Sequence, residues 1–160
     1  MIRDYRNSDL PELMDIANRA WQPIYDMFSD AYGEELFSIV TRDRSTGKGE
    51  QIRNHCASHP EWVYVCEAEG TIVGFVTFLL DRDRGIGTIG NNARDPLSTV
   101  KGIGQEMYGA VLTRFRQEGM KYAKVTTGMD DAHGPARRAY ERAGFDISHQ
   151  DITYYQAIGN

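Results

Sequence analysis

Residues 91–105 read NNARDPLSTVKGIGQ and join a predicted strand to a predicted helix. The strand is expected over 86–93, and apolar residues recurring every four positions predict an amphipathic helix over 104–117. Glycines between a strand and a helix let backbone N–H groups converge, and the helix dipole adds positive potential there. Gly102 and Gly104 therefore predict a site for a phosphate or pyrophosphate, with a glycine-eased tight turn as the alternative.

The rest of the chain predicts further strands and helices. Strands are expected at 1–5, 62–66, 71–80, 86–93, 121–127 and 151–157. Helices are expected from Asp9 as N-cap, over 29–40, weakly over 50–58, over 104–117 and from Gly134, with a polar loop at 42–49. Apart from the weak helix, the order is β-α-α-β-β-β-α-β-α-β. This order predicts an α/β fold with a mixed central sheet flanked by helices.

Composition favours one ordinary globular domain over residues 1–160. Hydrophobic residues make up 41% and charged residues 26%, and the net charge of −5 argues against a nucleic-acid partner. The longest apolar run, 71–80, is too short to span a bilayer. The N-terminus lacks the layout of a signal peptide, so we expect no membrane association and a cytoplasmic location.

Two other patterns carry less chemistry. The stretch 55–59 reads HCASH but lacks a second ligand pair, so we expect no metal site and no disulfide framework. Residues 85–90 read GIGTIG, which matches the dinucleotide fingerprint, but no helix can start in the following NNARDP. These glycines are expected to relax a strand or to allow the close approach of another backbone.

Two segments resemble the motifs of the GNAT superfamily of N-acyltransferases. Residues 91–104 are similar to its cofactor motif, a strand followed by V-x-P and then Q/R-x-x-G-x-G/A at a helix start. Residues 136–145, ARRAYERAGF, are similar to its A-x-x-x-Y-x-x-x-G-F segment, and the predicted element order matches over essentially the whole chain. The resemblance implies transfer of an acetyl group from acetyl-coenzyme A to an amine, without a metal.

The resemblance also implies which residues contact the coenzyme. They are Ala93, Arg94, Thr99, Val100, Lys101, Gly102, Ile103, Gly104, Gln105, His133 and Arg137. Three of them depart from the family pattern. Arg94 replaces the usual Val, and Thr99 replaces Gln or Arg, a loss of one donor for which Lys101 and backbone amides could compensate. His133 replaces Asn, and it either keeps a role near the pantetheine arm or simply ends the preceding loop.

Tyr140 has two interpretations. It lies on the apolar side of the last predicted helix, where it could be a core aromatic. In the family, a tyrosine at this place resembles a general acid for the coenzyme A sulfur, and a phenol with a pKa of about 10 can donate to a leaving thiolate. We favour catalysis. The expected reaction is direct attack of the amine, with the carbonyl polarised by a backbone N–H near Ala93 or Arg94.

The general base and the acceptor are less defined. Glu67, Asp81 and Asp83 are candidate bases, and no spacing singles one out. Aromatic residues with Asp26 and Asp30 before residue 61 would suit a cationic amine, or would be core aromatics with solvated carboxylates. Two other functions stay open, a non-catalytic acyl-coenzyme A sensor and a subunit whose exposed sheet edge builds an oligomer. A homodimer is therefore one possible assembly.

Overall fold

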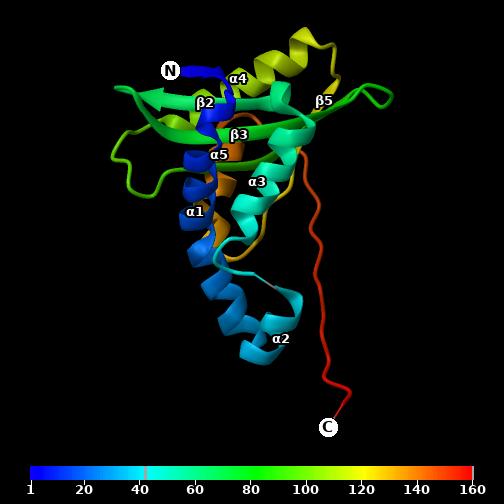
Figure 1. Cartoon of the computed structure of the whole chain (residues 1–160). Helices are drawn as coiled ribbons and strands as arrows, with labels where there is room; N and C mark the ends of the chain where they lie inside the picture. The colour runs from blue at the N-terminus through cyan, green and yellow to red at the C-terminus, as the bar shows by residue number, and fades with distance from the viewer. Residues whose placement is uncertain (42, 160) are drawn as a thin grey trace.

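Five strands form one mixed sheet in the order β1-β2-β3-β4-β5 (Figure 1). The computed structural model describes residues 1–41 and 43–159. The strands are β1 (Ile2–Asp4), β2 (Val63–Ala68), β3 (Thr71–Asp81), β4 (Ile86–Arg94) and β5 (Tyr122–Val125). Neighbours from β1 to β4 are antiparallel, whereas β5 runs parallel to β4. The predicted mixed α/β architecture is confirmed.

Helices cover both faces of this sheet. They are α1 (Leu10–Tyr32), α2 (Glu34–Val40), α3 (Gly47–Ser58), α4 (Ile103–Gln117) and α5 (Gly134–Arg142). Three short 3-10 turns accompany them, η1 (Asn7–Asp9), η2 (Pro60–Trp62) and η3 (Asp131–His133). One buried cluster joins the sheet to α1 and α3, and a second joins it to α4 and α5. The end of α1 and α2 project beyond the sheet (Figure 1).

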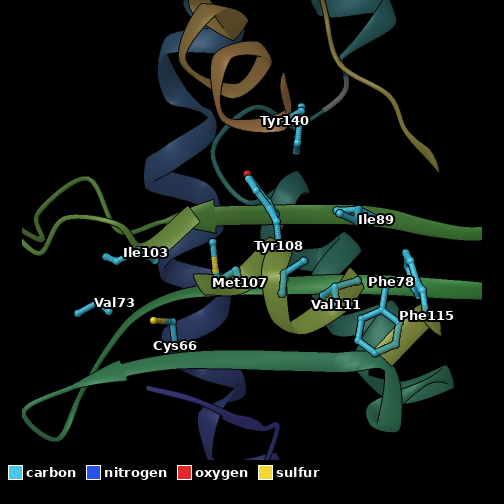
Figure 2. Packing of buried hydrophobic residues seen from close by; sticks show 11 residues of the cluster. Cys66, Val73, Phe78, Ile89, Ile103, Met107, Tyr108, Val111, Phe115 and Tyr140 are labelled. Carbon is cyan, nitrogen blue, oxygen red and sulfur yellow. The ribbon is translucent and has the colours of Figure 1, made fainter. Parts of the chain in front are cut away.

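The cluster between the sheet and α4 is the larger of the two cores (Figure 2). Met107, Val111 and Phe115 follow the predicted four-residue spacing along α4, and each is at most 3% exposed. The ring of Phe115 meets that of Phe78 on β3 at a centroid distance of 5.8 Å. The apolar periodicity read from the sequence therefore predicts the buried face of α4 correctly.

The helix boundaries before β2 differ from the prediction. The predicted start of a second helix at 29 is wrong, because α1 continues to Tyr32 and ends at Gly33, whose φ of 78° favours glycine. The weak third helix is confirmed and begins at Gly47, inside the predicted loop 42–49. Residue 42 of that loop lies outside the described residues.

Asp9 precedes α1 but does not cap it with its side chain. Its carboxylate instead accepts hydrogen bonds from Arg3 Nη1 at 2.8 Å, Arg3 Nη2 at 3.0 Å and the backbone N–H of Arg6 at 2.8 Å. Burial pushes the pKa of Asp9 up, but these hydrogen bonds outweigh it and lower the pKa. The prediction that the Asp9 side chain caps α1 is therefore wrong. Its carboxylate binds Arg3 and Arg6 instead, and so links β1 to the start of α1.

The last predicted strand, 151–157, is wrong for this structure. No strand follows α5 in the described part of the chain, and residues 146–159 are exposed. Figure 1 shows this segment, orange to red, running away from the sheet on the side of α3 and α2. A strand needs a neighbouring strand for its backbone hydrogen bonds, and this segment has none. The predicted strand 121–127 is confirmed over the shorter range of β5.

No helix in the described ranges, 1–41 and 43–159, combines the length and apolarity needed to cross a membrane.

Candidate functional site

A β-bulge lies in β4 at the point where this strand separates from β5. The two strands pair only over Ile86–Ile89 of β4, and residues 90–94 have no strand on that side among the described residues. At the point of separation, Gly90 and Asn91 together lie opposite the single residue Thr77 of β3. A Cβ at Gly90 would lie 2.7 Å from Thr77 Oγ1, so a side chain there would force a shift. Because bulges bend and twist a strand, we attribute the opening between β4 and β5 to this bulge.

Gly87, the second glycine of the GIGTIG stretch, has a packing role. A Cβ at Gly87 would lie 2.5 Å from the ring of Phe115. Residues 85–90 enter β4 rather than a helix, so the dinucleotide fingerprint is a chance match. The expected close approach of another backbone is not what the structure shows, because the atoms nearest to Gly87 and Gly90 belong to the side chains of Phe115 and Thr77.

The start of α4 lies beside the end of β4. Gly102 precedes the helix in the left-handed conformation, with φ 80° and ψ 0°, and the helix begins at Ile103, within one residue of the prediction. A Cβ at Gly102 would meet nothing within 4 Å, so the space beside this residue is open. A Cβ on Gly74 would lie 2.9 Å from Ala93 O and 3.0 Å from Ile103 Cγ2. The free N–H groups of the first helical turn therefore lie close to the separated half of β4.

Tyr140 points from α5 toward this region and belongs to a three-residue polar network. The amide of Asn92 on β4 donates to the Tyr140 hydroxyl at 3.1 Å and to Gly90 O at 3.0 Å. The hydroxyl of Tyr108 on α4 donates to Asn92 Oδ1 at 2.8 Å. The rings of Tyr108 and Tyr140 are 5.0 Å apart, and Figure 2 shows the Tyr108 hydroxyl directed toward Tyr140. Three elements, β4, α4 and α5, thus meet at the Asn92 side chain, and Tyr140 itself is only 7% exposed.

Sequence reasoning missed Asn92 and Tyr108. Tyr108 is 4% exposed, and burial and then the neighbouring Tyr140 raise its pKa, so its hydroxyl stays neutral. The usable signal was an asparagine pair inside a predicted strand, where β-branched and aromatic residues are preferred. A polar residue in such a place indicates a specific partner.

Several predicted coenzyme contacts use their side chains to hold the site together. Arg94 Nη2 donates to Ser98 O at 2.6 Å and fixes the loop before α4. Gln105 Nε2 donates to Ala139 O at 3.0 Å and links α4 to α5. The side chain of Ile103 is buried in the core, which leaves its backbone for a ligand. The other predicted residues of this loop are exposed: Thr99, Val100 and Lys101.

His133 and Arg137 organise the loop before α5. Arg137 Nη1 donates to both Gly128 O and Asp130 O at 2.6 Å. His133 Nδ1 lies 2.7 Å from the carboxylate of Asp130, whose pKa is raised by burial but lowered overall by the His133 hydrogen bonds. In these contacts His133 fixes the loop end, the simpler of its two interpretations.

A second polar group lies on the opposite face of β4. Asn91 Nδ2 donates to Gln51 Oε1 at 3.3 Å, and Lys48 Nζ donates to the same oxygen at 3.1 Å. The Lys48 ammonium also sits 4.2 Å from the centre of the Trp21 ring. Burial lowers the pKa of Lys48 to about 8. The opening is therefore flanked by the tyrosine network on one face and by this lysine group on the other.

The aromatic residues before 61 had two interpretations, a site for a cationic amine or core aromatics with solvated carboxylates. Asp26 and Asp30 are exposed, and Asp26 accepts a hydrogen bond from Gln22 Nε2 at 2.8 Å. Trp21 already has the Lys48 ammonium over its ring. These contacts match the simpler interpretation, partly buried aromatics with solvated carboxylates.

The three candidate bases lie away from Tyr140. Glu67 accepts a hydrogen bond from Arg3 Nε at 2.7 Å, on the β1–β2 side of the sheet. Asp81 lies opposite Ile86, at the end of β4 that is distant from Asn92, and Asp83 follows in the turn. The separation of six residues along a strand corresponds to roughly 20 Å. None of these carboxylates therefore faces the polar network.

Other features of the surface do not coincide with this site. Two hollows of about 430 Å³ and 640 Å³ lie between β1 and α4 and beside the β3–β4 turn. Within residues 1–41 and 43–159, no three His, Cys, Asp or Glu side chains converge as metal ligands.

Comparison with known families identifies the chain. The model of the acetyltransferase (GNAT) family matches residues 12–145. The chain belongs to this family. The match spans the α4 glycine motif, the network of Tyr140 and α5, and it agrees with the resemblance found in the sequence. Enzymes of the GNAT family use acetyl-coenzyme A as co-substrate.

Solved structures share the GNAT fold at low sequence identity. PaiA N-acetyltransferase from Thermoplasma acidophilum, in complex with coenzyme A, is 18% identical with a TM-score of 0.73, covering 94% of this chain and 92% of its own. A GNAT family acetyltransferase from Brucella melitensis with acetyl-coenzyme A is 20% identical, with a TM-score of 0.61 and coverage of 97% and 95%. Ribosomal-protein-alanine N-acetyltransferase from Brucella melitensis is 17% identical, with a TM-score of 0.63 and coverage of 91% and 84%. A search among curated proteins found no match.

Proposed function

We propose that residues 1–160 form one N-acetyltransferase domain that moves an acetyl group from acetyl-coenzyme A to a primary amine of a small molecule or peptide. The observation that supports this most is the place of the Tyr140 hydroxyl. It lies in a polar network at the opening between β4 and β5, beside the start of α4. Two free, buried cysteines, Cys56 and Cys66, are consistent with action in the cytoplasm.

In this proposal the start of α4 binds the pyrophosphate of the coenzyme. The first-turn N–H groups have no partner within the helix, the space beside Gly102 is open, and the helix dipole favours an anion there. Lys101 is exposed and adds a positive charge. Arg94, Gln105 and Arg137 act by holding the surrounding loops, because their donors already bind backbone oxygens.

The unpaired side of residues 90–94 receives the acyl arm. Its backbone lacks a neighbouring strand, so an extended ligand can take the place that β5 leaves. A backbone N–H near Ala93 or Arg94 polarises the thioester carbonyl. The two faces of β4 then serve different tasks, with Asn92 on the tyrosine side and Asn91 on the side of α1 and α3.

Tyr140 acts as the general acid. The neutral amine attacks the carbonyl carbon and forms the C–N bond, the C–S bond breaks, and the sulfur receives the Tyr140 proton. The amine nitrogen releases its proton to water, and Tyr140 is reprotonated from water. Because the Asn92 amide donates to the Tyr140 oxygen, the O–H proton is directed away from Asn92. The attack is direct, in a ternary complex, with no acyl-enzyme intermediate.

A broad amine screen tests this function. The protein is incubated with acetyl-coenzyme A and panels of amino acids, polyamines, aminoglycosides and peptides, and thiol release is followed together with product mass. We expect an amine product heavier by one acetyl group. Tight coenzyme A binding without acetylation of any amine would instead support the non-catalytic sensor.

A further inference from the structure

Lys48, in the first turn of α3, is a half-buried cation without a negative partner. Within residues 1–41 and 43–159 its ammonium donates to the neutral Gln51 Oε1 at 3.1 Å and forms no ion pair. Nearby carboxylates have other partners, because Glu50 pairs with Arg53 and Asp43 accepts hydrogen bonds from the turn before α3. Burial of this unpaired charge is unfavourable and lowers the pKa of Lys48 to about 8. A buried charge of this kind indicates a functional partner of opposite sign.

The contact between α1 and α3 fixes the position of Lys48. The two helices lie on the same face of the sheet (Figure 1). The N–H of Gly49 donates to Asn18 Oδ1 on α1 at 2.7 Å, and a Cβ at Gly49 would lie 3.1 Å from Met14 O, so a side chain there would push α3 away. The Trp21 ring on α1 lies 4.2 Å from the Lys48 ammonium. An aromatic face attracts a cation but carries no charge to neutralise it.

Two donors from separate elements converge on one oxygen beside Lys48. Lys48 Nζ on α3 and Asn91 Nδ2 on β4 lie 3.1 Å and 3.3 Å from Gln51 Oε1. A carboxylate oxygen is bound well by this arrangement, in which a charged donor and an amide donor are directed at one point. The Gln51 side chain is exposed, so it can turn away and leave the point to an oxygen of a ligand.

This oxygen position lies on the same face of β4 as Ala93, near which the thioester carbonyl is proposed to bind. Asn91 faces α3, and Ala93 belongs to the core between the sheet, α1 and α3. Two residues span roughly 7 Å along a strand. An amine that attacks the carbonyl near Ala93 therefore has the oxygen position within the reach of a short acceptor molecule.

We propose that the acceptor is an amine that also carries a carboxylate, such as a free amino acid, and that Lys48 and Asn91 bind this carboxylate in place of Gln51 Oε1. This inference rests on the proposed function and names the acceptor class for it. The carboxylate neutralises Lys48, and both donors replace the water that it loses. A polyamine would instead bring a second cation to Lys48, which is unfavourable. Lys48 is thus a specificity-determining residue.

Matched pairs of acceptors test this specificity. Glycine, β-alanine, γ-aminobutyrate and glutamate are each compared with the corresponding carboxamide at saturating acetyl-coenzyme A, and thiol release and product mass give kcat and KM. We expect the wild-type kcat/KM to favour the carboxylate of at least one pair by about tenfold or more, the size of a charge-assisted hydrogen bond. Lys48→Met is expected to abolish this preference, mainly by raising KM for the carboxylate.

Two further variants separate the effect of charge from that of packing. Gln51→Glu keeps the size of the side chain but places a carboxylate beside Lys48, so it is expected to compete with the acceptor and to abolish the preference as well. Arg53→Met is the matched control, because it removes an exposed cation from the same helix, and it is expected to retain the preference. Circular dichroism checks that each variant is folded.

Calorimetry decides the inference separately from turnover. The same pairs are titrated into the protein saturated with coenzyme A, and tighter binding of the carboxylate is expected in the wild type and not in Lys48→Met. Equal values for both members of every pair, a preference that Lys48→Met retains, or a best acceptor without a carboxylate would overturn this inference and leave acetyl transfer in place. A protein that acetylates no amine would reject the proposed function, and calorimetry would still show whether Lys48 binds a carboxylate.

Discussion

Replacing Tyr140 with Phe removes one hydroxyl from the polar network and little else. The ring keeps its contacts with Tyr108 at 5.0 Å and Phe145 at 6.0 Å, so the volume of the core is preserved. The substitution removes one hydrogen bond, the one that the Asn92 amide donates to the Tyr140 hydroxyl. The Asn92 amide retains its bond to Gly90 O. We therefore expect the free energy of unfolding to fall by only about 1 kcal/mol.

The expected effect on turnover is much larger. A general acid contributes roughly a hundredfold to ten-thousandfold, which corresponds to about 2.7 to 5.4 kcal/mol of transition-state stabilisation. The Tyr140 proton is needed only as charge develops on the sulfur. The affinity for coenzyme A is therefore expected to change by less than about threefold. A water molecule in place of the hydroxyl would put the loss in rate at the smaller end of this range.

The assay measures thiol release at saturating acetyl-coenzyme A and the amine found in the screen, with calorimetry for coenzyme A binding. Tyr108→Phe is the matched control, because it removes the other hydroxyl of the same network, which donates to Asn92 Oδ1. We expect its turnover to fall by less than about tenfold. A folded Tyr140→Phe protein with near-wild-type turnover, where chemistry limits the rate, would show that Tyr140 is only a core aromatic.

Other consequences concern the helix start and the two buried charges. Gly104→Ala is sterically tolerated, its Cβ meeting the nearest side chain at 3.6 Å, but calorimetry should show coenzyme A affinity reduced by about tenfold. Gly109→Ala on the same helix should leave affinity unchanged and raise stability by about 0.5–1 kcal/mol in urea unfolding. Asp9→Ala should cost about 3 kcal/mol in urea at pH 7, and this difference should vanish as the pH falls from 3.8 through the lowered pKa of Asp9. Burial lowers the pKa of Lys48 to about 8 in the folded protein. Above that pH, Lys48 therefore binds more protons in the unfolded chain than in the folded one. Wild-type stability should therefore rise between pH 8 and 10.5, and Lys48→Met should remove that rise in urea titrations.

Local patterns predicted the parts of the fold that depend on local physics. The four-residue apolar repeat gave α4 within one residue of its observed start, and the alternating β-forming stretches gave β2 and β3. The boundary between α1 and α2 was misplaced because helical periodicity continues through Ser29, whereas the break depends on the backbone conformation of Gly33. Asp9 was misread because its partner, Arg3, belongs to a strand whose position relative to α1 is set by the sheet.

The candidate site depended on contacts that no local pattern contains. Gly102 was singled out by its place between a predicted strand and a predicted helix, and Tyr140 by the resemblance of its segment to a known family. Asn92 became visible only once β4, α4 and α5 were assembled, since its two partners are 16 and 48 residues away. The bulge at Gly90 also depends on a contact between segments that are separate in the sequence. Its glycine was noticed in the sequence, but the reason for it is a threonine on the neighbouring strand.

The C-terminal segment shows how far a strand pattern reaches. Alternating β-formers at 151–157 indicate that the segment can pair, but they do not indicate with which strand. In the structure the outer edge of β5 and this segment remain apart, so the predicted strand is absent. The prediction failed because a pattern within one segment cannot show whether a neighbouring strand will supply its backbone hydrogen bonds.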